Sequence, residues 1–372
     1  MIWSWSLLLC ALAASLIHAF FISRIRRSIT DSVNNPASEP LKGVSVIVCA
    51  KNEAEHLDVL IPKILNQRHP NFELILVNEH SSDQTQQVIE YWAKTDHRVR
   101  PFTLKEQAKT LGKKAALSFG ISQAAHDLLL LTDADCTPAS SDWIELMTAP
   151  LRTGKSVALG YGGYRKQSGL LNSIIRFETT LTAGLFLGQA VAGYPYMGVG
   201  RNLVYRKEFF YAQGGFKSHE HIASGDDDLL VNYGANKNNK AVVLDPKAFT
   251  WSQPQTTWGG LFKQKRRHQS TAHFYRTQTI ITLSLYSGSI LLFYACLLFL
   301  GLIRHAEISF CGAIIALITA RALYLIWQLK PIFKKFQSRD LYLWIPIQEP
   351  LLICMQLIIF VWNRFSKPNH WN

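Results

Sequence analysis

The amino-acid sequence predicts an α/β domain with a mainly parallel sheet, flanked at both ends by segments that can cross a membrane. Short aliphatic runs alternate with helix-like segments between about residues 41 and 270, which is the pattern of successive βαβ units. Acidic clusters directly follow several of these runs, and long apolar stretches lie outside them at each end. The predicted organisation is one folded domain held at a membrane.

Composition and charge favour a membrane-associated protein. Of the 372 residues, 48% are hydrophobic and 17% are charged, and 39 Lys and Arg against 26 Asp and Glu give a net charge of +13. Much of the positive charge flanks apolar segments, where it suits the headgroups of anionic membrane lipids. No basic array interleaved with aromatic residues stands on a soluble module, so nucleic-acid binding is not expected. The six cysteines lack metal-ligand spacing, which predicts reduced thiols in apolar surroundings.

The first 23 residues are almost wholly apolar and are followed by Arg24, Arg26 and Arg27. A cleaved signal peptide usually carries its positive charges before the apolar run rather than after it. We therefore expect residues 1–23 to be an uncleaved anchor whose C-terminal side is cytoplasmic. Residues 24–41 would link it to a cytoplasmic domain of a multi-pass cell-membrane protein.

The C-terminal region, residues 277–362, contains two or three further candidate membrane segments. Apolar stretches run over Thr277–Ile303, Ile308–Leu329 and about Leu341–Trp362. Basic residues between the last two predict a cytoplasmic connector. A third crossing would leave the tail, residues 363–372, outside against this bias, whereas a re-entrant hairpin around Pro346 and Pro350 would not.

Two ionisable residues, Arg321 and Glu349, lie inside these apolar stretches. Such groups are costly in a membrane unless they are paired or face a cavity. Mutual pairing, snorkelling toward the headgroups and a role near an acceptor path each account for them.

The central region predicts buried parallel strands separated by helices. We expect strands at Val44–Cys49, Phe72–Val77 and Asp127–Leu131, and helices at Ala54–Asn66, from a cap at Ser81 or Ser82 through Ala93, and at Leu111–Ala125. Ligands of such sheets bind beyond the carboxyl ends of the strands. The polar residues directly after each strand are therefore the candidate site.

Three polar clusters follow these strands. Ala50, Lys51, Asn52 and Glu53 come after the first, residues 78–85 after the second, and Thr132–Cys136 after the third. Carboxylates gathered at one sheet edge repel one another unless a cation compensates them. A hard divalent ion with phosphate ligands provides that compensation. Asp133 and Asp135 directly follow a strand of four leucines, which favours a site over a solvated turn.

The order of four motifs resembles the nucleotide-sugar domain of family 2 glycosyltransferases, which have the GT-A fold. The motifs are VSVIVCAKNE, VNEHSSDQT, LGKKAAL and LLLLTDADC. The resemblance implies nucleotide-sugar contacts by Ala50, Asn52, Glu53, Glu79, Asp83, Lys113 and Asp133. It also implies that Asp135, with Asp133 beside it, binds Mg2+ or Mn2+. The second motif departs from the family, because Asn78-Glu79 replaces the usual pair of aspartates. For Lys113 and its neighbour Lys114, a solvated helix start is the alternative.

The second half of the domain resembles the acceptor side of the same family. Residues 197–216 form a glycine-rich segment, in which Gly198 and Gly200 would allow close backbone approach to a ligand. Adjacent aspartates then precede two leucines. One of them would be the catalytic base: alignment on Gly225 favours Asp227, and alignment on the Asp-Leu pair favours Asp226. Capping of a helix N-terminus is a structural alternative that can coexist with catalysis.

The segment FKQKRRH, residues 262–268, is similar to the QxxRW motif of processive members of the family. Gln264 and Arg267 match that motif, and His268 replaces its tryptophan. Arg266 or Arg267 would bind the diphosphate, since guanidinium suits bidentate contacts. A juxtamembrane cluster that contacts headgroups is the alternative. The apolar segment Gly169–Ala192 fits either the membrane interface or a core helix.

The expected protein is a GT-A glycosyltransferase with its domain at residues 42–270, of which 42–140 bind the nucleotide-sugar and 141–270 the acceptor. The expected reaction is inverting, metal-dependent transfer from a UDP-sugar to a hydroxyl of a lipid or glycan acceptor near the membrane. A processive polysaccharide synthase, a catalytically inactive membrane scaffold and a nucleotidyltransferase are the alternatives. The sequence indicates no oligomeric state.

Overall fold

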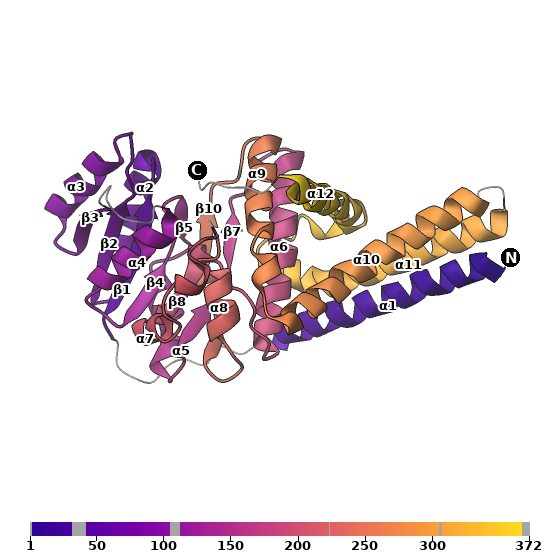
Figure 1. Ribbon diagram of the computed structural model, residues 1–372, viewed down its shortest axis with the longest axis horizontal. Coiled ribbons are helices and arrows are strands. Elements are labelled where there is room, and N and C mark those ends of the chain that lie inside the picture. Colours follow the sequence, from indigo (N-terminus) through magenta and orange to yellow (C-terminus); the bar gives the residue numbers. More distant parts are fainter. Residues whose placement is uncertain (1, 32–41, 105–111, 223, 305–306, 367–372) are drawn as a thin grey trace.

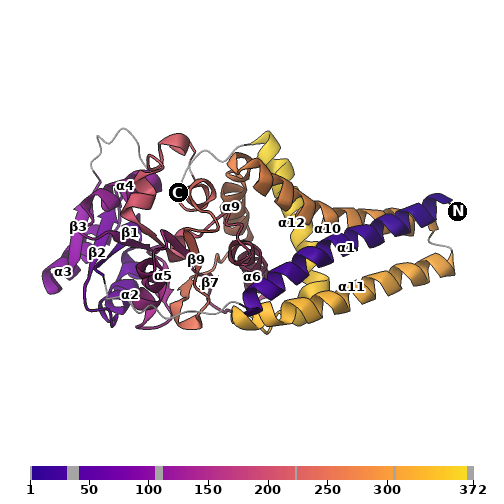
Figure 2. The same ribbon diagram turned by 90° about the horizontal axis from the view of Figure 1, so that it is seen from below.

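The computed structural model describes residues 2–31, 42–104, 112–222, 224–304 and 307–366. An α/β domain lies at one end of the elongated molecule, and a bundle of long helices extends from it toward the N-terminus (Figures 1 and 2). The predicted α/β class, with apolar helices at both ends of the chain, is confirmed.

The core of the domain is a seven-stranded sheet in the order β3-β2-β1-β4-β8-β6-β9, beside a smaller sheet in the order β5-β10-β7. The strands are β1 (Val44–Ala50), β2 (Phe72–Asn78), β3 (Val99–Thr103), β4 (Leu128–Leu131), β5 (Cys136–Pro138), β6 (Val157–Leu159), β7 (Gly162–Tyr164), β8 (Leu203–Arg206), β9 (Lys240–Val242) and β10 (Thr250–Ser252). Within the large sheet only β8 runs antiparallel to its neighbours, β4 and β6. The sheet is therefore mainly parallel, and its central strands are covered on both faces.

The helices around the sheets are α2 (Ala54–Leu65), α3 (Thr85–Thr95), α4 (Lys113–Gln123), α5 (Trp143–Arg152), α6 (Leu170–Val191), α7 (Lys207–Tyr211), α8 (Asp228–Gly234) and α9 (Trp258–Gln269). Short 3-10 helices are η1 (Gly200–Asn202), η2 (Lys217–His219), η3 (Pro246–Ala248), η4 (Ala272–Phe274) and η5 (Tyr342–Trp344). The predicted cap of α3 was wrong: the capping residue is Gln84. Ser81 and Ser82 instead hydrogen-bond to the loop after β1.

Helix α6 lies between the sheets and the long apolar helices (Figure 1). Its charged residues are paired within the protein. Glu178 pairs with Lys265 of α9. Arg176 donates to both carboxylate oxygens of Asp340, at 2.8 and 2.9 Å. Most of its residues are buried. Of the two predictions for this segment, the core helix is therefore the one confirmed.

Three long helices form the bundle: α1 (Ile2–Asp31), α10 (Thr277–Arg304) and α11 (Ile308–Lys335). Helix α1 packs along both α10 and α11 and continues past residue 23, so the helix is longer than the predicted anchor. Ala11 and Ala14 are buried against Phe293 and Leu297, because small residues let neighbouring helices approach closely. The rest of the predicted linker, residues 32–41, lies outside the described residues.

The last helix, α12 (Ile345–Phe365), runs across the bundle rather than along it (Figures 1 and 2). It is one continuous helix with Pro346 in its first turn, a position that needs no N–H donor. The predicted re-entrant hairpin is therefore wrong. Its C-terminal end contacts α9, where Arg266 donates to Asn363 (3.0 Å) and lies over the Trp362 ring. In the described part of the chain, four helices including α12 are long and apolar enough to cross a membrane.

The two ionisable residues in the apolar helices pair with each other. Arg321 of α11 donates to both carboxylate oxygens of Glu349 in α12, one of them at 2.9 Å. His18 of α1 lies 2.9 Å from the same guanidinium, and the Tyr294 hydroxyl of α10 donates to Glu349 at 2.9 Å. One polar network therefore joins the four apolar helices, as expected for charges that cannot reach water.

Candidate active site

The carboxyl ends of β1, β2 and β4 lie side by side at one edge of the large sheet. Ala50 pairs with Asn78 across β1 and β2, and Ile47 of β1 pairs with Leu131, the last residue of β4. Because the three strands are parallel, the loops that follow them meet at this edge. The polar clusters predicted from the sequence are therefore brought together.

The loops after β1 and β2 are joined by side-chain hydrogen bonds. Asn52, at φ 58°, accepts from the Ser82 N–H (2.8 Å), and its own N–H donates to Ser81 Oγ (2.9 Å). Asp83 accepts from the Thr85 N–H (3.0 Å) and from the backbone of the first turn of α2 (3.3 Å). Asn52 and Asp83 thus hold the shape of this part of the site.

Two glutamates stand beside these loops. Glu53 lies 2.5 Å from His56, and burial raises the pKa of its carboxyl group, with Asp133 and Asp135 adding to the shift. Glu79 is only 2% exposed, burial raises its pKa, and its Oε2 has no hydrogen-bond partner among the described residues. An unpartnered buried oxygen of this kind is suited to a donor group on a ligand.

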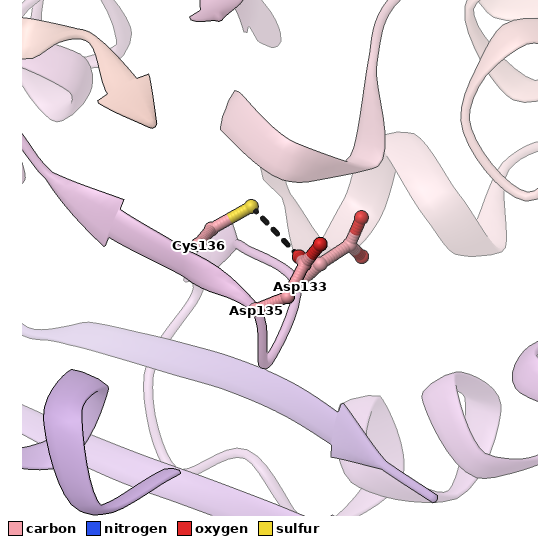
Figure 3. A group of neighbouring side chains, drawn as sticks. All are labelled: Asp133, Asp135 and Cys136. Carbon is pink, nitrogen blue, oxygen red and sulfur yellow. Dashed lines mark hydrogen bonds between the residues drawn. The ribbon is translucent and has the colours of Figure 1, made fainter. Parts of the chain in front are cut away.

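The carboxylates after β4 form a compact group. Ligand atoms of Asp133, Asp135 and Cys136 all lie within 4.8 Å of one another (Figure 3). Burial and the charge of Asp133 raise the pKa of Asp135. A divalent cation would remove this repulsion, and the two carboxylates are the oxygen ligands that Mg2+ and Mn2+ prefer.

Cys136 orients this group rather than adding a thiolate to it. Burial holds the pKa of its thiol well above the usual value, so the sulfur keeps its proton. The thiol donates to Asp135 Oδ1 at 3.3 Å (Figure 3) and lies 2.8 Å from Ser252 Oγ. The atoms of this group that would bind a metal ion are therefore carboxylate oxygens.

Lys113 joins the two halves of the site. Its ammonium lies 2.8 Å from Asp133 and 3.1 Å from Asp226, and its side chain is 21% exposed. Burial lowers the pKa of Lys113, but the nearby carboxylates outweigh this effect and hold the pKa well above its usual value. The neighbouring Lys114 is buried and donates to the carbonyls of His219 (2.6 Å) and Ile222 (2.9 Å). Neither lysine is a solvated helix residue.

Asp226 and Asp227 have different environments. Asp226 is 7% exposed, and Lys113 lowers its pKa against the effect of burial. Asp227 is more exposed; its Oδ2 accepts from the Gly200 N–H (2.6 Å), and its Oδ1 accepts from the first N–H of α8 (2.7 Å). Burial and the flanking carboxylates raise the pKa of Asp227 to about 7. Asp227 thus caps α8 and also carries the pKa of a general base.

Asp228 has a structural role. Its carboxylate accepts hydrogen bonds from the hydroxyls of Thr271 and Tyr275, the latter at 2.7 Å. Both hydroxyls belong to the connection between α9 and α10, so Asp228 joins the site to the membrane bundle.

Gly200 lies at the centre of the charged group. A Cβ atom there would lie 3.2 Å from Lys113 Nζ and 3.5 Å from carboxylate oxygens of both Asp226 and Asp227. The predicted close backbone approach thus occurs at Gly200. At Gly198, a Cβ would instead meet apolar side chains, with Leu203 at 3.1 Å.

Arg201 is a site residue that the sequence reasoning missed. Its guanidinium lies 4.5 Å from the centre of the Tyr164 ring, and its carbonyl accepts from Thr132 Oγ1 (3.0 Å) in the loop after β4. Burial opposes the charge of Arg201, but Tyr164 and the cluster at residues 133–136 raise its pKa. Its place directly after Gly200 in the glycine-rich segment was the available signal.

The residues of α9 that were predicted to bind the donor contact different parts of the protein. Gln264 donates to the Tyr164 hydroxyl at 3.1 Å, which places it beside Arg201. Arg266 instead contacts Asn363 and Trp362 of α12, so its role in donor binding stays a prediction. Arg267 and the exposed His268 follow in the same helix.

Comparison with known proteins agrees with this geometry. The family model described as Glycosyl transferase family 2 matches residues 45–212. The poly-beta-1,6-N-acetyl-D-glucosamine synthase of Staphylococcus aureus (strain COL) is 26% identical over 300 residues, which cover 77% of this chain and 70% of that protein. The Staphylococcus epidermidis synthase is 26% identical over 257 residues, or 67% of this chain and 60% of that protein.

Among solved structures, the mannosyltransferase PcManGT from Pyrobaculum calidifontis, in complex with GDP-Man and Mn2+, is similar in fold. Its TM-score is 0.59 at 18% identity, and the match covers 93% of this chain and 99% of that chain. The fold, the matched family and the curated relatives agree with one another and with the acidic edge of the sheet. The chain accordingly has the GT-A fold, and its residues 45–212 are similar to the family 2 glycosyltransferases.

Proposed function

We propose that the protein transfers one sugar, with inversion, from a metal-bound UDP-sugar to a hydroxyl group of an acceptor at the cytoplasmic face of the membrane. The main support for this proposal is the pair of salt bridges from Lys113 to Asp133 and Asp226. They make one continuous charged group out of the predicted metal ligands and the predicted catalytic aspartates.

Each residue of this group has a proposed role in a single displacement. Asp133 and Asp135 would hold the divalent ion, which neutralises the diphosphate when bound. Lys113 and Arg201 would add positive charge where the leaving diphosphate develops its charge. Asp227 would accept the proton of the acceptor hydroxyl while the oxygen of that hydroxyl bonds to the anomeric carbon and the bond from this carbon to the diphosphate breaks. Its pKa of about 7 suits that step near neutral pH.

The donor is proposed to lie over the loops after β1 and β2. Ala50, Asn52, Glu53, Glu79 and Asp83 would contact its nucleoside. Because Glu79 offers an unpartnered carboxyl oxygen, it suits an N–H donor such as that of uracil. The curated relatives are N-acetylglucosamine polymer synthases by name, so UDP-N-acetylglucosamine is the first donor to test. The presence of Mn2+ in the Pyrobaculum structure supports trying Mn2+ before Mg2+.

The proposed topology has α1, α10 and α11 crossing the membrane, while α12 runs from the Arg321–Glu349 network inside the bundle to the cytoplasmic face. Basic residues at the domain end of these helices support this orientation. The contact of Arg266 with Asn363 keeps the end of α12 beside the domain. Arg364 at the end of α12 then stays on the cytoplasmic side without a hairpin.

The test uses membranes that contain the protein, a panel of labelled nucleotide-sugars, and Mn2+ or Mg2+. The wild type should transfer label from one donor only with metal, and Asp135→Asn should lose roughly 10²-fold or more of this activity. The matched control is Asp127→Asn, an exposed aspartate at the opposite end of β4. Absence of turnover and of nucleotide-sugar binding in the wild type would refute the proposal and favour an inactive scaffold. Transfer of a nucleotidyl group in place of the sugar would reassign the reaction.

A processive synthase is the second candidate, because the curated relatives are polymer synthases by name. The described bundle offers little support for export of a polymer by this chain, since its interior is filled by apolar side chains and the Arg321–Glu349 network. His268 also replaces the motif tryptophan. Product length decides the question: one sugar per acceptor supports the first proposal, and a ladder of products supports the second.

A further inference from the structure

A cavity of about 440 Å³ lies where α1, α6 and α10 meet the domain. Figure 1 shows this junction of the bundle with the sheet domain. Its wall includes Arg24 near the domain end of α1, Gln189 near the end of α6, and Gln278 and Thr279 at the start of α10. Because α1 and α10 are long enough to cross a membrane, a cavity at their domain ends lies at the depth of lipid headgroups.

The cavity is strongly cationic. Arg24, Lys237 and Arg276 line it, and none of its lining residues is acidic. The guanidinium of Arg24 lies 4.7 Å from the centre of the Tyr194 ring, which holds it against the cavity wall. Three positive charges around one space repel each other, so an anionic group in the cavity would be stabilised.

The cavity also has an unpartnered polar group, and hydrogen bonds connect the segments that line it. Gln189 is 4% exposed, and its Nε2 has no hydrogen-bond partner among the described residues. An amide N–H left in this state is costly unless an acceptor binds it. Asn232 joins opposite walls, because its Nδ2 donates to the Tyr196 carbonyl and its Oδ1 accepts from the Arg276 N–H, both at 2.9 Å.

We propose that this cavity binds a membrane-lipid headgroup whose phosphate carries a net negative charge. Phosphate oxygens are the acceptors that guanidinium, ammonium and amide donors require together, and Leu283 adds an apolar surface at the start of α10. The cavity lies at the far end of α8, whose first turn is capped by Asp227. A headgroup bound there would lie at the opposite end of the helix that Asp227 caps. The same chemistry occurs in phospholipids and in polyprenyl phosphates.

The proposal is tested by native mass spectrometry of the full-length protein after it is exchanged out of its native lipids. The protein is incubated with phosphatidylglycerol, with phosphatidylcholine or with a polyprenyl phosphate. The wild type should retain one phosphatidylglycerol or one polyprenyl phosphate at concentrations where phosphatidylcholine is lost. Arg24→Gln and Lys237→Gln should each weaken this binding about fivefold or more. Arg27→Gln is the matched control, because it removes an exposed charge from the same helix outside the cavity.

The outcomes separate this site from the catalytic one. Retention of phosphatidylglycerol identifies a phospholipid site. Retention of the polyprenyl phosphate alone identifies a site for polyprenyl phosphates. Equal binding by Arg24→Gln and Arg27→Gln, or equal binding of phosphatidylcholine, overturns the proposal. Each variant is also checked for binding of nucleotide-sugar, which a folded protein with an altered cavity should keep. Lipid binding does not require turnover, so failure of the proposed reaction would leave this result interpretable.

Discussion

Lys113 and Asp226 form a salt bridge of 3.1 Å that joins the half of the domain predicted to bind the nucleotide-sugar to the half predicted to bind the acceptor. Lys113 begins α4, and Asp226 lies in the loop before α8. The same ammonium is 2.8 Å from Asp133. One cation therefore compensates carboxylates from both halves, and its removal should affect folding and donor binding together.

Lys113→Met should destabilise the metal-free protein by about 1–3 kcal/mol, because it leaves carboxylates uncompensated in a partly buried site. A divalent ion replaces part of the missing charge. Added Mn2+ should therefore raise the thermal transition temperature more in the variant than in the wild type. The control Lys247→Met removes an exposed lysine 3.9 Å from Asp142 and should change stability by less than ~1 kcal/mol. Equal effects of the two substitutions would contradict this role of Lys113.

The transfer rate should depend on the protonation of Asp227. Its pKa is raised to about 7, so the carboxyl group is protonated and inactive as a base below that pH. kcat should rise about tenfold per pH unit on the acid side and level off above about pH 7. Asp227→Asn should lower kcat by roughly 10²- to 10⁴-fold with little change in donor binding.

Asp226→Asn is the informative comparison. Because Asp226 pairs with Lys113, this substitution should weaken donor binding. The acid limb of the pH profile should remain but move to lower pH, since the charge of Asp226 contributes to the raised pKa of Asp227. If Asp226→Asn removed the acid limb and Asp227→Asn kept it, the base would be Asp226.

Gly200→Ala should impair catalysis more than stability. The added Cβ would lie 3.2 Å from the Lys113 ammonium, and the flexible lysine can move to relieve that contact. Movement of the lysine away from Asp133 and Asp226 should lower kcat/KM about tenfold. Gly259→Ala is the matched control, since nothing lies within 4 Å of a Cβ at that helical position. The control should be neutral or more stable by up to ~1 kcal/mol, and equal loss of activity in both variants would argue against crowding at Gly200.

The Arg321–Glu349 pair should stabilise the bundle only as a pair. Arg321→Met or Glu349→Leu alone leaves a buried charge and should cost roughly 3–5 kcal/mol. The double variant should cost clearly less than the sum, because no unpaired charge remains. Unfolding of the detergent-solubilised protein in a double-mutant cycle measures this coupling. Additive losses would mean that the two groups are solvated separately.

Local patterns in the sequence were sufficient to predict the edge of the sheet and the acidic residues that lie there. A buried parallel strand reads as a continuous apolar run, so the ends of Val44–Ala50, Phe72–Asn78 and Leu128–Leu131 could be predicted within a residue. Polar residues at those ends then identify Asp133 and Asp135 as ligand candidates. Three of the four apolar helices were predicted for the same reason, because crossing a membrane requires long runs without charge. The fourth was predicted only as either a further crossing or a hairpin.

Contacts between distant segments could not be obtained in this way. Arg201 reaches the loop after β4, Arg266 turns to α12, and Asp226 and Asp227 differ through their separate bonds to Lys113 and Gly200. Motif spacing carries no information on such contacts, because they depend on how helices and loops pack. The sequence by itself determined the fold class, the apolar helices and the carboxylates at the strand ends. Tertiary packing decided which charges meet, and therefore which carboxylate is neutralised and which is poised to accept a proton.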